Sequence, residues 1–178
     1  MSEPCLLCQI VEGRIPSKVI YEDDVSIAIL DFSGAAIGHT FIVPKAHHTI
    51  FEQVPDDIVA RVFENANKVS STLFESLEVQ GTNIFVANGI AAGQQVPHFF
   101  VHVIPRVEGD GIDIQWAPKQ LGEEEMSTIE LTLKEQIKDV VSFVEEKKKS
   151  SPIEKKTVII TSKKGEDNYL VKQIKRIP

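Results

Sequence analysis

The segment from His98 to Ile104 alternates between two kinds of side chain. Successive side chains of a strand point to opposite faces of a sheet. One face is apolar (Phe99, Val101, Val103) and predicts burial, while the other carries His98, Phe100, His102 and Ile104. A buried imidazole needs hydrogen-bond partners, so two histidines beside an aromatic ring predict a polar site. The alternative is an exposed sheet on which both imidazoles face solvent.

The first two thirds of the chain predict an antiparallel sheet and one long helix. Strands are expected over residues 18–21, 25–31, 38–44, 82–87 and 99–105, and a short helix closed by Gly13 over residues 5–13. Residues 55–77 carry an apolar stripe with helical period and two aspartates in the first turn. The predicted fold is therefore α+β, with about five strands and the long helix packed on them.

Beyond Trp116 the pattern changes to a second long helix over residues 122–148 and a hairpin with strands at 157–162 and 168–174. We therefore predict a domain over residues 1–118 and a C-terminal extension over 119–178. Residues 1–145 hold 9 basic and 22 acidic residues, whereas residues 146–178 hold 10 basic and 4 acidic ones. This basic tail is typical of a solvated helix end, and contact with RNA or an acidic partner is the alternative.

The composition is that of a globular protein, and it limits the classes to which the chain can belong. The chain has 178 residues, 42% hydrophobic and 25% charged, as in globular proteins. Its longest apolar runs are too short to cross a bilayer. The opening MSEPCLLCQI has no basic region of the kind that starts a signal peptide. We therefore expect a cytoplasmic protein without a membrane partner.

The loop over residues 88–97 leads into the histidine-bearing strand. It contains Asn88, Gly89, Gly93 and Gln94. Glycine lets backbone N–H groups approach an anion closely, so such a loop can hold a phosphate, although the same residues also simply form turns. Upstream, His39 begins a strand and His47 follows a proline on a loop.

Two segments together resemble the histidine-triad (HIT) family of nucleotide-binding proteins. They are Gly38-His39-Thr40-Phe-Ile-Val-Pro44-Lys45-x-His47 and Gly93-Gln94-x-Val96-Pro97-His98-x-Phe100-x-His102-Val-Ile-Pro105-Arg106. The resemblance covers residues 5 to about 118 and implies the family's fold and a related hydrolase or transferase function. In the family, the second triad histidine attacks the α-phosphorus. Phe100 stands there and has no lone pair to offer, so the covalent nucleotidyl-histidine route is not expected.

The resemblance also implies a role for several other residues. It assigns Asp31 to the ribose, Phe32 to the base, and Asn88, Gln94 and the loop around Gly93 and Val96 to the phosphate. His39 and His102 match the histidines that support the nucleophile and the phosphate oxygens. The alternatives are purely structural roles, in which Asp31 caps a turn and Asn88 is present only because it tolerates a left-handed backbone conformation.

The cysteines imply a second site. In the branch of the family that begins with Cys-x-x-Cys, zinc is held by positions that correspond to Cys5, Cys8, His47 and His98, with His48 as a substitute for His47. Two thiolates and two imidazoles suit tetrahedral, structural zinc. A redox dithiol is the rival interpretation, and a disulfide is a weaker one.

Three functions follow. The first is a nucleotide-binding protein without covalent turnover, which family resemblance suggests is a homodimer that the C-terminal part could extend. The second is a hydrolase in which His39 or His102 activates water against a non-nucleotide heterocycle, such as a formyl- or acyl-folate. The third is RNA or protein interaction through the basic tail.

Overall fold

The computed structural model describes residues 5–149. The chain divides into two compact units, residues 1–115 and 116–178. The second unit contributes one described element, helix α3 (Glu123–Lys149). The predicted hairpin and most of the basic tail lie outside the described residues, so the RNA hypothesis stays a prediction. Among the helices that are described, none has the length and apolar character needed to cross a membrane.

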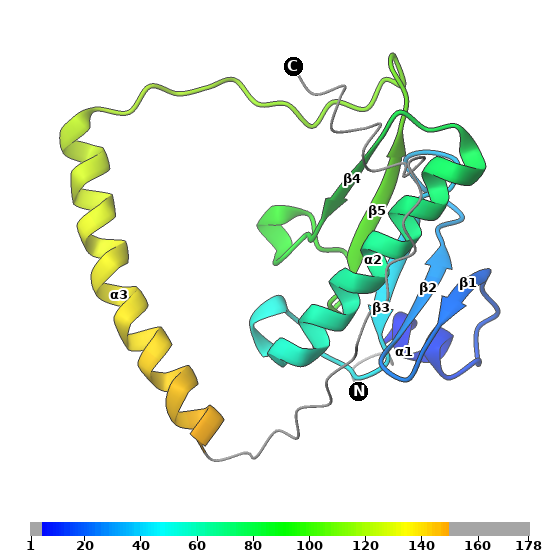
Figure 1. Ribbon diagram of the computed structural model, residues 1–178, viewed down its shortest axis with the longest axis horizontal. Helices are drawn as coiled ribbons and strands as arrows, with labels where there is room; N and C mark the ends of the chain where they lie inside the picture. Colours follow the sequence, from blue (N-terminus) through cyan, green and yellow to red (C-terminus); the bar gives the residue numbers. More distant parts are fainter. Residues whose placement is uncertain (1–4, 150–178) are drawn as a thin grey trace, which may run out of the picture. The chain divides into compact units, whose positions relative to one another are not determined.

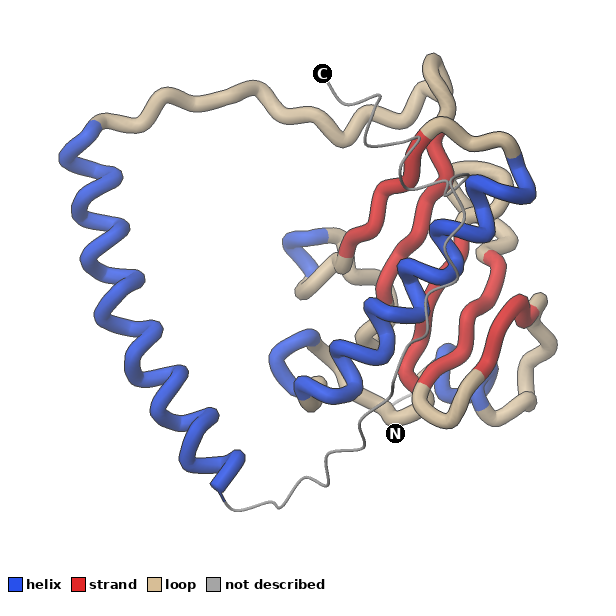
Figure 2. The backbone as a smooth tube through the Cα atoms, viewed as in Figure 1, coloured by secondary structure: helices blue, strands red, loops and turns tan. Residues whose placement is uncertain are grey.

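The first unit is built on a five-stranded antiparallel sheet with the strand order β1-β2-β3-β5-β4 (Figures 1 and 2). Its strands are β1 (Val19–Glu22), β2 (Ser26–Leu30), β3 (Thr40–Pro44), β4 (Gly81–Phe85) and β5 (Val101–Arg106). The helices are α1 (Leu6–Val11) and α2 (Asp56–Leu77), with 3-10 turns η1 (Phe51–Gln53) and η2 (Ile90–Ala92). The predicted α+β architecture is confirmed.

Helix α2 crosses one face of the sheet (Figure 2). Its buried stripe packs on the inward side chains of β2, β3 and β5, namely Val62, Ala66, Val69 and Leu73 against Ala28, Ile42, Val101 and Val103. Gly38 makes the close approach possible at the end of the helix. Its φ is +92°, and a Cβ there would lie 2.7 Å from Cδ1 of Leu77.

The opposite face of the sheet carries a smaller cluster. Because side chains alternate along a strand, Ile27, Ile29 and Val43 point away from α2. They pack with Leu7 of α1, so α1 covers this second face. Each sheet face thus has its own helix, and the second face is only partly covered because α1 has six residues.

Strand β5 begins at Val101, two residues later than predicted. The alternation nevertheless extends back through the preceding segment. Phe99 is buried under α2, and its backbone N–H donates to the carbonyl of His48 at 2.6 Å. This bond replaces the ladder pairing that a longer strand would have made.

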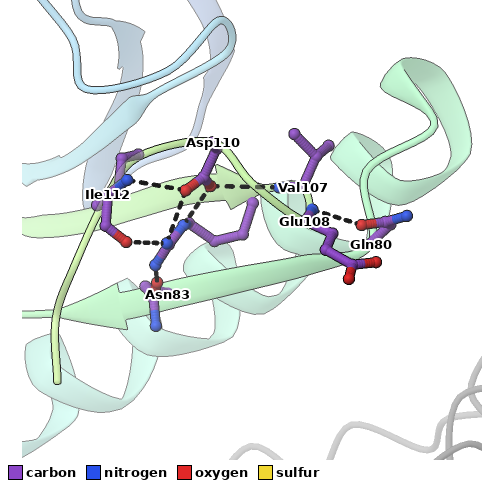
Figure 3. A network of polar contacts seen from close by, with 7 residues as sticks. Gln80, Asn83, Val107, Glu108, Asp110 and Ile112 are labelled. Carbon is purple, nitrogen blue, oxygen red and sulfur yellow. Dashed lines mark hydrogen bonds and ion pairs between the residues drawn. The ribbon is translucent and has the colours of Figure 1, made fainter.

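An arginine closes the turn that follows β5 (Figure 3). Arg106 donates Nε to Oδ2 of Asp110 at 2.6 Å and Nη2 to Oδ1 at 2.9 Å, and it also donates to the side chain of Asn83 and the carbonyl of Ile112. These bonds, together with the backbone N–H of Ile112, hold the pKa of Asp110 well below its usual range. The network ties the end of β5 to β4 and to the chain beyond it.

Candidate functional site

A pocket of about 630 Å³ opens between α1 and the sheet. Nine residues were expected to take part in catalysis or ligand binding, and eight of them line this pocket: Asp31, Phe32, His39, Gly93, Gln94, Val96, Phe100 and His102. The ninth, Asn88, is not among the lining residues. The pocket therefore gathers side chains from β2, the loop after it, β5 and the loop over residues 88–97.

His39 and His102 form a directed hydrogen-bond chain. The backbone N–H of Ala35 donates to Nδ1 of His39 at 3.0 Å, and Nε2 of His39 lies 3.1 Å from Nδ1 of His102. An imidazole nitrogen that accepts a hydrogen bond carries no proton. We therefore assign the proton of neutral His39 to Nε2, which donates to His102. The proton of His102 then lies on Nε2, so its second nitrogen is a donor.

Both imidazoles are neutral near pH 7. Burial lowers the pKa of His102 to about 4, with a further contribution from His39, and burial also lowers the pKa of His39. Oδ2 of Asp31 lies 3.5 Å from Nδ1 of His39, the same atom that Ala35 approaches more closely. The two contacts compete for one nitrogen. In neutral His39 the shorter one holds, and the Asp31 contact becomes an ion pair only on protonation.

Phe100 belongs to an aromatic group around His102. Its ring centroid lies 4.7 Å from that of His102 and 4.8 Å from that of Phe41. Phe85 stacks on His102 at 4.5 Å with an interplanar angle of 7°. Phe41 and Phe85 are the partners of His102 on the two neighbouring strands. The ring of His102 is therefore fixed by three aromatic neighbours as well as by His39.

The amides of the loop are engaged within the protein. Gln94 accepts from the backbone N–H of Gly89 at 2.8 Å and donates to the carbonyls of Thr49 and Val96. It lines the pocket, but its visible bonds shape the loop. Asn88 likewise accepts from the N–H of Phe51 and donates to Glu52 at 2.7 Å. Its expected role in phosphate binding stays a prediction.

A second cluster lies beside the pocket and consists of Cys5, Cys8, His47 and His98. One ligand atom from each residue lies within 4.8 Å of the others. Sγ of Cys8 is 3.2 Å from Nδ1 of His47, and both sulfurs are 3.5 Å from Nδ1 of His98. Tetrahedral zinc with ordinary Zn–S and Zn–N bonds separates such ligands by about 3.3–3.8 Å.

The surroundings of His98 also fit a metal ligand. Nε2 of this buried residue lies 3.1 Å from the carbonyl of Pro44, which places its proton on Nε2 and leaves the lone pair of Nδ1 toward the cysteines. Burial lowers the pKa of His98, which keeps the ring neutral. Cys5 and Cys8 are free thiols. His48 is not part of the cluster.

The sequence predicts one polar site that contains His98, Phe100 and His102. In the structure these three residues belong to two sites. His98 joins the cysteines, while Phe100 and His102 line the pocket. Metal cluster and pocket are adjacent parts of one face. Two groups of residues were missed: the apolar side chains of α1, and the cross-strand neighbours of His102. Of these neighbours, Phe41 lines the pocket, whereas Phe85 stacks on His102 and is not among the lining residues. The first group was visible as Leu6, Leu7 and Ile10 around the cysteines, whereas the second depends on strand register.

Comparison with known proteins agrees with this geometry. Residues 12–109 match the family model described as the HIT domain. The uncharacterized HIT-like protein MJ0866 of Methanocaldococcus jannaschii is 43% identical over 107 residues, which are 60% of this chain and 82% of that protein. The adenosine 5'-monophosphoramidase HNT1 of Candida albicans is 28% identical over 141 residues, 76% of this chain and 93% of the relative.

A solved structure shows the same fold. A zinc-bound histidine triad family protein from Mycobacterium smegmatis superposes with a TM-score of 0.60 and 34% identity, over 67% of this chain and 86% of the other. The family model covers more than half of the chain, and the sheet order, the pocket and its paired imidazoles are in place. The chain belongs to the HIT family.

Proposed function

We propose that this chain is a zinc-containing HIT protein that binds a purine nucleotide without forming a nucleotidyl-histidine intermediate. The observation that carries this proposal is Phe100, which lines the pocket beside His102. The family resemblance assigns the nucleophile to this position. A phenyl ring cannot attack phosphorus. The relative named as an adenosine 5'-monophosphoramidase supports an adenosine phosphate as the ligand class.

The residues of the pocket would divide the work of binding. Nε2–H of His102 donates to a phosphate oxygen. Oδ1 of Asp31 accepts from the N–H of Ser33 at 2.9 Å, so Oδ2 is the oxygen left to accept from a ribose hydroxyl. Phe32, 76% exposed at the rim, covers the base. Zinc, when bound to the four-residue cluster, supplies structural cross-linking.

The test is Phe100→His compared with the unmodified chain. We expect the unmodified chain to bind AMP in calorimetry and to leave adenosine 5'-monophosphoramidate intact. Restoring an imidazole should raise its hydrolysis by about three orders of magnitude or more. Phe41→His is the matched control, because it adds an imidazole to the same pocket away from the nucleophile position, and it should gain nothing.

Two results would count against this function. Equal turnover by the unmodified chain and Phe100→His would show that Phe100 does not block the chemistry. Absence of AMP binding in both proteins would show that the pocket does not bind an adenosine phosphate.

A second candidate is favoured by the aromatic surroundings of His102. Phe41 and Phe100 line the pocket beside His102, and such aromatic rings suit a flat heterocycle, such as a folate that carries a formyl or acyl group. Water would attack the carbonyl carbon, and the C–N bond would break with the proton passing to nitrogen. In the assigned tautomer, Nε2–H of His102 would polarise the carbonyl rather than accept a proton from water. Product release that disappears in His102→Asn would support this function.

We also propose a homodimer that acts in the cytoplasm. Strand β4 forms one edge of the sheet, and its Ile84 and Phe85 are 40% and 38% exposed. An uncharged, apolar edge strand invites pairing with another strand. The cytoplasm suits the cluster because its thiols must stay reduced to bind a metal.

A further inference from the structure

Helix α1 is shared by the metal cluster and the pocket. Cys5 stands at its N-terminal cap, and Cys8 follows within the helix. Between and after them, Leu6, Leu7 and Ile10 line the pocket. Helix α1 together with its N-cap residue therefore carries two of the four metal ligands and part of the wall against which a ligand would lie.

This helix has little to hold it in place by itself. It has no side-chain cap at its N-terminus, no acidic residue in its first turn and no basic residue in its last turn. Leu7 is its only buried residue. Isolated helices of this length are marginal in water, so the order of α1 depends on its tertiary contacts. Those contacts include the apolar cluster around Leu7 and the thiols that face His47 and His98.

The other side of the cluster leads to the floor of the pocket. His98 is fixed to β3 through the carbonyl of Pro44, and Phe100 follows two residues later. Phe100, Cys5 and Ile10 all pack against the apolar cluster that contains Leu7. The metal ligands thus connect the wall of the pocket, α1, to its floor, the segment that leads into β5.

We propose that zinc at Cys5, Cys8, His47 and His98 orders the α1 wall of the pocket and thereby raises the pocket's affinity for its ligand. Cys5 and Cys8 are then positioning residues for ligand binding. The coupling is reciprocal: a ligand that contacts α1 strengthens zinc binding by the factor by which zinc strengthens ligand binding. The affinity part rests on the proposed nucleotide-binding function, whereas the ordering of α1 does not.

The test uses the full chain, loaded with zinc or stripped by a chelator, with AMP as the probe. We expect AMP to bind at least about tenfold more weakly to the stripped protein, and zinc to bind more tightly by the same factor when AMP is present. Hydrogen exchange should show lost protection in residues 6–11 after stripping, while β2 and β3 stay protected. Cys8→Ser should reproduce the stripped state without a chelator.

Leu6→Ala is the matched control. Leu6 is about half exposed and lines the pocket, so this change removes a contact between α1 and the ligand while both thiols stay. Zinc affinity without AMP should be unchanged, and the factor that couples zinc and AMP should shrink toward one.

Equal AMP affinity with and without zinc would overturn the coupling, and so would unchanged exchange in residues 6–11. If AMP bound neither form, the proposed function would fail. Exchange would then decide alone: zinc-dependent protection of residues 6–11 supports the ordering of the wall, and its absence overturns it.

Discussion

At the scale of single residues, the pocket is governed by where one proton lies. The backbone N–H of Ala35 donates to His39, His39 to His102, and His102 presents its remaining N–H. These hydrogen bonds form with both imidazoles neutral. Burial disfavours a positive charge on either ring, because it lowers the pKa of both imidazoles. The arrangement selects ligands that offer an acceptor atom beside Phe100.

This neutral pair makes stability depend on pH. The pKa of His102 is about 4 in the folded chain and near 6.5 in the unfolded one, so between these values the unfolded state binds the extra proton and stability falls as pH falls. In His102→Asn the amide oxygen can still accept from His39. With zinc saturating, urea unfolding should show a loss between pH 7 and pH 5 that is smaller in the variant by about 1 kcal/mol, allowing for solvent screening.

Zinc is kept saturating for both proteins at each pH, so the difference between the two profiles isolates His102. Parallel pH profiles for the two proteins would show that His102 titrates alike in the folded and unfolded states.

At the scale of elements, the sequence predicted those features that depend on residues close together in the chain. The apolar stripe of α2 and the alternation from His98 to Val103 are patterns of this kind, so both were predicted. The stacking of Phe85 on His102 arises from the pairing of β4 with β5, and no local pattern contains that register. The assignment of Phe100 to the nucleophile position came from the family resemblance, because a phenylalanine by itself is more typical of a hydrophobic core.

The end of α2 gives a prediction of its own. Glu78 caps this helix with φ +53°, in the left-handed region, and is the one non-glycine residue with positive φ in the described chain. Glycine adopts this conformation without the Cβ clash. Glu78→Gly should raise the free energy of unfolding by about 1 kcal/mol, measured by urea or thermal unfolding.

Glu75→Gly is the comparison variant, since Glu75 is exposed and lies within the helix. There the same replacement should destabilise by about 1 kcal/mol. Two losses of similar size would mean that the backbone at Glu78 costs nothing.

At the scale of the whole molecule, the two edges of the sheet differ. Strand β1 has a register irregularity between Val19 and Tyr21, and its Glu22 pairs with Lys45 at 2.7 Å. Bulges and charges are features that keep edge strands from pairing. Strand β4 carries neither, and its exposed side chains are Ile84 and Phe85. The geometry therefore favours β4 as the place where a second copy adds its own strand.

Ile84→Lys places a charge on the β4 edge and should convert the proposed dimer to a monomer in light scattering at micromolar concentration. Ile20→Lys is matched in exposure, at 47% against 40%, but lies on β1, and it should leave the mass unchanged. An unchanged mass for Ile84→Lys, or dissociation caused by Ile20→Lys, would place the interface elsewhere.

Pairing along β4 would also affect ligand binding. Phe85 of β4 stacks on the imidazole of His102, which faces the ligand, so an added strand would bury Phe85 and fix this imidazole further. Monomeric Ile84→Lys should therefore bind AMP more weakly than the dimer, in the same calorimetric assay.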